Sequence, residues 1–148
     1  MKRALSNYKK IGIDTNIFIY YLNQGSPYYL HAVALFTVFI KKQAILITST
    51  LTLTEILSLK TTTEPLLSMI EEAIVSMPNL QLISADRIIA KRAAQIRRMY
   101  NFALTDSVQL ATALENNAEV FITNDKKLQR FKKLPVILLT SLSLQNKQ

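Results

Sequence analysis

The residues of this chain most suited to chemistry are its few carboxylates. The 148-residue sequence contains four aspartates: Asp14, Asp86, Asp106 and Asp125. Asp14 ends the apolar run KIGID, Asp125 follows the apolar run VFIT, and Asp106 opens the helical pattern TDSVQLATALEN. Glu55 lies inside the otherwise uncharged segment STLTLTEILSL. Because burying an ionised carboxylate among apolar side chains is costly, Glu55 predicts a cation, hydrogen bonds or a water-filled cleft close by.

Helix capping is the other role open to these aspartates. Aspartate is a common N-cap residue, and Asp14, Asp106 and Asp125 each stand near the expected start of a helix. Asp86 is interpreted as such a cap or first-turn charge. Capping does not require the three site candidates, because other polar residues stand beside them: Thr15, Asn16, Thr105 and Asn124. It also leaves Glu55 unexplained, so we interpret the carboxylates as one site.

The elements that must position these residues alternate along the chain. Five apolar runs have the length of strands, at residues 10–14, 44–48, 80–83, 120–123 and 136–139. Segments with helical spacing lie between them, at residues 17–22, 30–39, 51–59, 66–77, 88–99 and 107–114. This alternation predicts an α/β fold with a central parallel sheet covered on both faces. Functional groups gather at the carboxyl ends of such strands, which is where Asp14 and Asp125 fall.

Composition restricts the class of protein. A length of 148 residues suits a single domain spanning residues 1–148, and a hydrophobic fraction of 49% argues against disorder. The absence of cysteine excludes disulfides and zinc–thiolate sites, and it fits a reducing cytosol. The basic N-terminus lacks the apolar core of a signal peptide, and no apolar stretch is long enough to span a membrane. We therefore expect a cytoplasmic protein without a membrane partner.

A strong excess of positive charge predicts a polyanionic partner. The formal net charge is +8, with 18 Lys and Arg against 10 Asp and Glu. Such a balance favours nucleic acid through contacts to phosphate. Lys126, Lys127 and Arg130 directly follow Asp125, and Lys132 and Lys133 extend the basic run. We predict that the first three contact RNA phosphates.

A second basic segment, ADRIIAKRAAQIRRMYN, has two interpretations. Helical spacing places Arg87, Lys91 and Arg98 close to one face, with Arg97 beside it. This face could hold an RNA backbone, or it could be an ordinary solvated surface. The apolar residues expected to face the core are Ile88, Ile89, Ala93 and Ile96.

Several carboxylates at one edge of a sheet need a compensating charge. Like charges raise one another's pKa values, and a divalent cation removes that conflict. A site of oxygen ligands suits Mg²⁺ or Mn²⁺, and Mg²⁺ keeps waters and open positions for phosphate oxygens. Such an ion supports hydrolysis of phosphodiester bonds. The residues Asp14, Glu55, Asp106 and Asp125 therefore predict a metal-dependent nuclease.

The same residues resemble a known family. The stretch IGIDTNIFIYYL is similar to the opening of a PIN domain, the nuclease fold of the VapC toxins. LTLTEILSL resembles the second motif of that family, with Glu55 in the acidic position. LTDSVQLATALENNAEVFITNDKKLQRF resembles the third and fourth motifs joined, with Asp106 and Asp125. The resemblance covers residues 11–131 and is most specific in the joined motif.

The resemblance implies a fold, an activity and partners. It implies a three-layer α/β/α sandwich and an endoribonuclease that uses Mg²⁺ or Mn²⁺ held by the four carboxylates. Asn16 and Thr123 fall on positions that support the family's site through hydrogen bonds. Toxin members are inhibited by a small antitoxin protein and commonly form homodimers. We therefore expect RNA, an antitoxin and a second copy of the chain as partners.

Three other functions compete with a nuclease. A catalytically silent PIN-like module would bind RNA without cutting it, although such a binder would gain by losing carboxylates near phosphate. A phosphatase of the haloacid-dehalogenase type also has aspartate at the end of its first strand. That chemistry needs a second aspartate two positions later, where this chain has Asn16. A phosphorelay receiver needs an acidic pair at that strand end, and only Asp14 is present.

Overall fold

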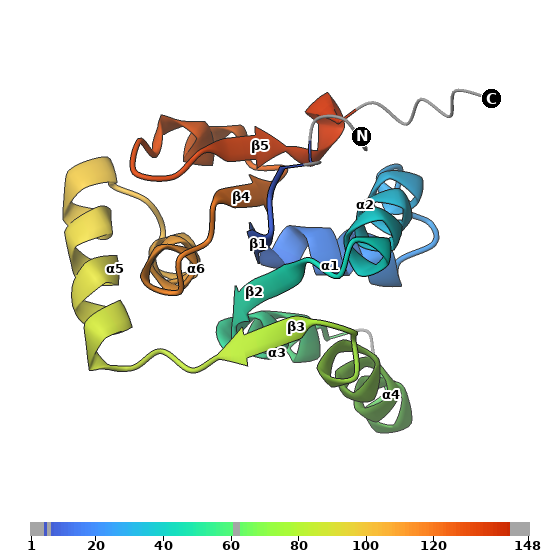
Figure 1. Ribbon diagram of the computed structural model, residues 1–148. Coiled ribbons are helices and arrows are strands. Elements are labelled where there is room, and N and C mark those ends of the chain that lie inside the picture. The colour runs from blue at the N-terminus through green and yellow to red at the C-terminus, as the bar shows by residue number, and fades with distance from the viewer. Residues whose placement is uncertain (1–4, 6, 61–62, 143–148) are drawn as a thin grey trace.

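A parallel sheet of five strands forms the centre of the molecule, in the order β3-β2-β1-β4-β5 (Figure 1). The computed structural model describes residues 5, 7–60 and 63–142. The strands are β1 (Lys10–Ile13), β2 (Ile45–Ser49), β3 (Leu80–Ile83), β4 (Val120–Thr123) and β5 (Val136–Leu138). Each strand begins and ends within one residue of its predicted run, and the predicted fold class is confirmed.

Helices cover both faces of the sheet. They are α1 (Thr15–Leu22), α2 (Tyr29–Lys41), α3 (Leu51–Leu57), α4 (Glu64–Val75), α5 (Arg87–Tyr100) and α6 (Leu104–Glu115). Two short 3₁₀ helices follow β4 and β5: η1 (Lys126–Arg130) and η2 (Leu139–Ser141). Helices α5 and α6 lie on one side of the sheet and α1 to α4 on the other (Figure 1). The architecture is therefore a three-layer α/β/α sandwich.

Side chains of the central strands alternate between the two cores. In β4, Val120 and Ile122 pack into the core formed with α1 and α2, whereas Phe121 packs into the core formed with α5 and α6. In β1, Ile11 and Ile13 enter the first core. Because both faces of a covered parallel strand are buried, these strands are apolar throughout, which is why they stand out in the sequence.

Gly12 allows α6 to approach the sheet closely. A Cβ atom at this position would lie 2.6 Å from the Cβ of Ala113 in α6 and 2.7 Å from a ring carbon of Phe121. Both distances are too short for real contacts, so any larger residue would push helix and strand apart. The glycine therefore sets the distance between β1, which ends before Asp14, and α6, which carries Asp106.

The predicted buried face of α5 is correct except at one residue. Ile89, Ala93 and Ile96 are buried, as expected. The expectation for Ile88 is wrong, since 62% of its surface is exposed. Neighbouring residues on a helix lie about 100° apart, so a stripe centred on residues 89, 93 and 96 cannot include position 88.

The turn between α5 and α6 directs the second helix toward the strand ends. Asn101 ends α5 in the left-handed conformation, with φ of 54°, and its backbone N–H donates to the carbonyl of Arg97. Asparagine tolerates this conformation better than most residues.

Among the described residues, no helix is long and apolar enough to span a membrane.

Candidate active site

Asp14 lies at the carboxyl end of β1, where it is only 6% exposed. It is the N-cap of α1, and its Oδ1 accepts a hydrogen bond from the backbone N–H of Thr15 at 2.8 Å. Its Oδ2 accepts from the hydroxyl of Thr123 at 2.5 Å and from the amide nitrogen of Asn16 at 3.1 Å. Both carboxylate oxygens are therefore held by donors on β4 and α1.

Thr123 joins the ends of β1 and β4. Its single hydroxyl hydrogen is donated to Asp14. Its oxygen accepts from the amide nitrogen of Asn16 at 3.2 Å and from the backbone N–H of Asp125 at 3.0 Å. One donor and two acceptor positions are all that a hydroxyl offers, so Thr123 is fully used. The Oδ1 of Asn16 is buried and has no hydrogen-bond partner in the part of the chain that the structure describes.

The other three carboxylates lie on separate elements. Glu55 is half-buried on α3, and Asp106 is half-buried in the first turn of α6. Asp125 is the N-cap of η1, and its Oδ1 accepts from the backbone N–H of Lys127 at 2.8 Å. Within the described residues, Asp106 accepts no hydrogen bond from another side chain or backbone group, so it is not a cap.

The capping interpretation is therefore correct for part of the set. Asp14 and Asp125 cap α1 and η1, and Asp86 caps α5 by accepting from the N–H of Ile89 at 2.8 Å. The neighbouring polar residues do not take over this role. Asn124, for example, accepts from the hydroxyl and the N–H of Thr140 instead.

Burial and neighbouring carboxylates make Asp14 a weak acid. Burial raises the pKa of Asp14 from 3.8 to about 7, and Asp106 and Glu55 add to that rise through their like charge. The hydrogen bonds from Thr123 and Thr15 act in the opposite direction, but they are too weak to restore an ordinary pKa. Asp14 therefore sits in an acidic surrounding that needs a positive charge to remain ionised.

Asp106 shows the same conflict from the other side. Burial raises its pKa, and the carboxylates of Asp125 and Glu55 raise it further, whereas the positive charge of Lys127 lowers it. Asp14 has Asp106 and Glu55 as electrostatic neighbours, and Asp106 has Asp125 and Glu55. All four predicted site residues therefore belong to one electrostatic group. The structure thus brings together carboxylates that lie up to 111 positions apart in the sequence, between Asp14 and Asp125.

The donor set fits a hard divalent cation. The carboxylates of Asp14 and Asp106, whose pKa values are raised by burial and by neighbouring carboxylates, and the unpartnered buried amide oxygen of Asn16 suit Mg²⁺ or Mn²⁺. In the described ranges, however, no three acidic, histidine or cysteine side chains stand ready-made around one metal position. Mg²⁺ keeps several of its waters, so it does not require a complete cage of protein ligands.

A buried amide that sequence reasoning missed ties the site's elements together. The nitrogen of Gln109 donates to the hydroxyl oxygens of Thr15 at 3.0 Å and Thr52 at 2.7 Å. Its oxygen accepts from the N–H of Ser49 at 3.1 Å and from the hydroxyl of Thr48 at 3.3 Å. Gln109 therefore connects α6 with α1, β2 and α3. A polar side chain inside the apolar run SVQLATAL is the signal that could have identified it.

The basic residues predicted to contact RNA follow directly on the acidic group. Lys126, Lys127 and Arg130 are exposed on η1. Lys127 is close enough to Asp106 to lower its pKa. The guanidinium of Arg130 donates to the backbone carbonyl of Tyr100 at 3.0 Å and lies 5.0 Å from the centre of the Phe102 ring. Arg130 is thus held in place beside the turn that leads into α6.

Comparison with known protein families identifies the fold family. A family model of the PIN domain matches residues 11–134. The chain belongs to the PIN domain family. The match covers most of the chain and includes all four carboxylates. A comparison with curated proteins found no match.

Several solved structures have the same fold. VapBC2 from Rickettsia felis, bound to a DNA fragment from its promoter, aligns at a TM-score of 0.70 and 17% identity, over 87% of this chain and 98% of the matched chain. VapC20 from Mycobacterium tuberculosis, a sarcin-ricin loop cleaving toxin, aligns at a TM-score of 0.69 and 14% identity, over 84% of this chain and 98% of the matched chain. A toxin–antitoxin complex from Klebsiella pneumoniae aligns at a TM-score of 0.62 and 22% identity, over 88% of this chain and 97% of the matched chain. At these identities the likeness concerns the fold.

Proposed function

We propose that this PIN-domain protein is a metal-dependent endoribonuclease and the toxin of a toxin–antitoxin pair. The observation that carries the proposal is the group of like charges at the strand ends. Burial raises the pKa of both Asp14 and Asp106, and like charges raise it further, from Asp106 and Glu55 for Asp14 and from Asp125 and Glu55 for Asp106. A fold has little reason to gather carboxylates in this way unless a cation joins them.

Each residue of the group has a distinct task in the proposed reaction. Asp14, Glu55, Asp106 and Asp125 would hold Mg²⁺ or Mn²⁺. The chemistry that such an ion supplies is activation of a water molecule and polarisation of the phosphoryl group. Asn16 and Thr123 fix the orientation of the Asp14 carboxylate through their hydrogen bonds.

The basic residues of η1 would hold the RNA backbone beside the carboxylates. Lys126, Lys127 and Arg130 supply three positive charges within five residues of Asp125. Contacts from such residues to phosphate position a nucleic acid without reading its sequence. This arrangement would place a phosphodiester at the acidic group although the group itself repels it.

A toxin role implies partners as well as a substrate. Several solved neighbours are toxin–antitoxin complexes. This chain also exposes large apolar side chains on α4, such as Leu66, Met69 and Val75, of the kind that mark protein interfaces. We propose that a small antitoxin binds the protein, that the protein forms a homodimer, and that it acts in the cytoplasm.

A silent RNA-binding module is the second candidate. The observation in its favour is that no three candidate ligands of the described chain stand ready-made around one metal position. A protein of this kind would bind RNA through its basic surface but would neither take up metal nor cut the strand. The retained carboxylates count against it, because they weaken binding of phosphate.

Asp106→Asn is the substitution that best tests the nuclease. Since Asp106 accepts no hydrogen bond within the described residues, the amide removes charge without breaking a contact. We expect the variant to unfold at or above the wild-type temperature, because the repelled charge is gone, and to lose RNA cleavage by at least about a hundredfold, the scale of a group that acts in the transition state. The measurement is cleavage of a labelled RNA with Mn²⁺.

Glu71→Gln on α4 is the matched control, because it makes the same change of charge on an exposed residue of another element. It should cleave at the wild-type rate. Equal cleavage by Asp106→Asn and the wild type would refute the proposed role of the carboxylates.

A further inference from the structure

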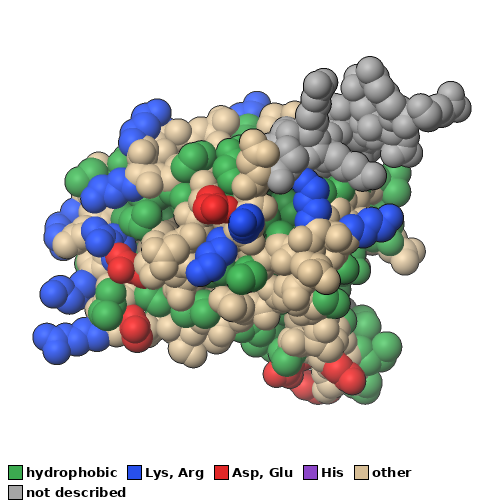
Figure 2. All heavy atoms as spheres, viewed as in Figure 1, with side chains coloured by type: hydrophobic (Ala, Val, Ile, Leu, Met, Phe, Trp, Pro, Cys, Tyr) green, Lys and Arg blue, Asp and Glu red, His purple; other side chains and the backbone are tan. Residues whose placement is uncertain are grey.

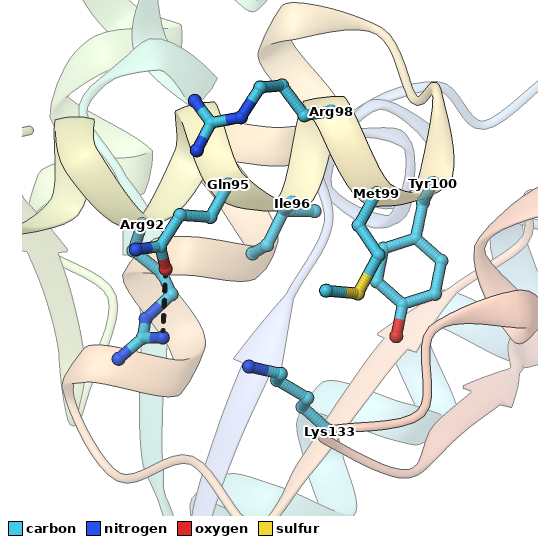
Figure 3. A pocket seen from close by; sticks show the side chains of 7 residues that line it. All are labelled: Arg92, Gln95, Ile96, Arg98, Met99, Tyr100 and Lys133. Atoms are coloured by element: carbon cyan, nitrogen blue, oxygen red, sulfur yellow. Dashed lines mark hydrogen bonds between the residues drawn. The ribbon is translucent and has the colours of Figure 1, made fainter.

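A pocket lies between α5 and the segment that follows η1, and nothing described so far uses it. Its volume is about 360 Å³, within the ~300–1,000 Å³ that small-ligand sites span. Figure 3 shows the residues that line it: Arg92, Gln95, Ile96, Arg98, Met99, Tyr100 and Lys133. Met99 points from α5 toward the segment that carries Lys133, whereas Arg98 extends along α5 away from it (Figure 3).

The lining combines positive charge with apolar surface. Arg92 forms an ion pair with Glu115 and also donates to Gln95 at 3.1 Å. Arg98 and Lys133 are exposed and have no acidic partner among the described residues. Met99 is 65% exposed, so its side chain offers apolar surface to a ligand. The Lys133 ammonium group opposite the apolar side chain of Met99 suits a ligand with both a phosphate and a flat, weakly polar part.

Tyr100 gives the pocket a rigid wall. Its ring stacks on Phe102, with centroids 5.2 Å apart and planes inclined by 7°, and it meets Phe131 edge-on at 5.3 Å. Its hydroxyl oxygen accepts from the backbone N–H of Lys132 at 3.3 Å. The hydroxyl hydrogen has no acceptor among the described residues, so it is free to donate to a ligand.

Fixed contacts connect the pocket to the carboxylates. Arg130 donates to the carbonyl of Tyr100 at 3.0 Å and, through its Nε, to the carbonyl of Lys127 at 3.3 Å. Lys127 in turn is an electrostatic neighbour of Asp106. Positive side chains therefore follow one another from the acidic group along η1 to Lys133, with a spacing of three residues. Lys127 and Arg130 lie in η1, whose 3₁₀ geometry places residues at this spacing on the same face, and Lys133 follows beyond the end of η1.

We propose that the pocket binds one nucleotide of the RNA beyond the bond that is cut, with its phosphate on Lys133 and its base against Met99 and Tyr100. The proposal rests on the proposed ribonuclease function and adds a second point of attachment for the substrate. Stacking on an apolar or aromatic surface tolerates any base, so the pocket would add affinity and direction rather than sequence preference.

A neighbouring residue offers a matched control for a binding test. Lys132 carries the same charge as Lys133 and is also exposed, but it does not line the pocket. We would measure the affinity of Lys133→Ala and Lys132→Ala for a fluorescent 2′-O-methyl RNA decamer as the salt concentration rises.

The variant Lys133→Ala should lose one phosphate contact, and the control Lys132→Ala should lose none. For Lys133→Ala, the slope of log affinity against log salt should become shallower by about 0.7, the value of one phosphate contact on a single strand. Met99→Ala should weaken binding by about tenfold, the scale of one lost base contact. A 4-thiouridine in the decamer should crosslink to the peptide that contains Met99 and Tyr100.

Three outcomes would overturn the proposal. Equal salt slopes for Lys133→Ala and Lys132→Ala, together with no crosslink on α5, would show that the pocket does not bind RNA. If the wild-type protein still cleaved RNA, the proposed function would remain intact. If polyglutamate displaced the decamer at the same concentration of negative charge, the pocket would recognise charge alone and not a nucleotide. A wild-type protein that neither binds nor cuts RNA would refute both proposals together.

Discussion

Asp14 is the residue on which the electrostatics of the site depend. Its carboxylate accepts three hydrogen bonds, from Thr15, Asn16 and Thr123, yet burial and the nearby carboxylates still raise its pKa to about 7. Near neutral pH the metal-free protein therefore holds a mixture of protonated and ionised Asp14. A cation would favour the ionised form, so uptake of metal should release protons.

This raised pKa predicts how the metal-free protein responds to pH. The folded state binds the Asp14 proton more tightly than the unfolded state does, so this group stabilises the fold below about pH 4 and loses that contribution as the pH rises to about 7. The loss is at most about 4 kcal/mol, at about 1.4 kcal/mol per pH unit. Urea unfolding in EDTA across this range measures it.

The comparison that isolates Asp14 is the variant Asp14→Asn, which has no group to titrate. The free energy of unfolding of this variant should fall less between about pH 4 and about pH 7 than that of the wild type. Added Mn²⁺ should restore stability at neutral pH only in the wild type. The same pH dependence in both proteins would mean that Asp14 does not titrate in this range.

Individual site residues differ in how far the sequence reveals them. Glu55 stands out because a charge among apolar residues demands an explanation. Asn16 and Thr123 were expected to support the site only because of the family resemblance, since a hydrogen bond across 107 residues leaves no local trace. Gln109 was missed because an uncharged amide in an apolar helix attracts less attention, although burying its polar groups poses the same problem.

At the scale of elements, the strands are well predicted and the helix ends less so. Strands buried on both faces are short apolar runs with visible limits. Helix α6, in contrast, begins at Leu104, three residues before the predicted start at residue 107. Leu104 and Thr105 do not continue the buried stripe, so apolar periodicity could not show the first turn. Asp106 consequently lies inside that turn rather than before the helix.

The network around Gln109 predicts coupling between elements. Replacement by methionine keeps the volume but leaves the hydroxyls of Thr15 and Thr52 and the N–H of Ser49 without their amide partner. We expect Gln109→Met to lower the free energy of unfolding by about 3 kcal/mol, since each unpaired buried polar group costs about 1–3 kcal/mol. It should also weaken Mn²⁺ binding, because α1 and α3 lose their common anchor. Urea unfolding and metal titration measure the two effects.

Asn116→Ala tests the same helix without the network. The side chain of Asn116, the C-cap of α6, donates to the carbonyl of Thr112 at 2.8 Å and has no other hydrogen bond within the described residues. Its removal should lower stability by less than about 1 kcal/mol and leave metal affinity unchanged. Wild-type metal affinity in Gln109→Met would show that the network holds the core together but does not position the carboxylates.

At the scale of the whole molecule, charge is distributed unevenly. Helix α5 carries five basic residues and no acidic one, whereas α4 carries three glutamates and no basic residue. Figure 2 shows lysine and arginine side chains gathered over α5, at the opposite end from the acidic and apolar side chains of α4. The sequence predicts the net charge of +8, but only the fold shows that α5 and α4 lie at opposite ends.

This division fits a molecule that meets two kinds of partner. The basic end continues from η1 past the pocket on α5, where RNA is proposed to lie. The apolar and acidic surface of α4 lies away from it and suits a protein partner. Both surfaces can therefore be occupied at once, unless a partner also reaches the carboxylates.

The central claim is that the carboxylate group cuts RNA with the help of a divalent cation. The most direct test is to strip the purified protein with EDTA, remove the chelator, and follow cleavage of a labelled RNA as Mn²⁺ is added. We predict no cleavage before metal addition and a rate that rises and saturates with Mn²⁺. Undiminished cleavage by the stripped protein, or tight RNA binding without cleavage at any Mn²⁺ concentration, would contradict the claim.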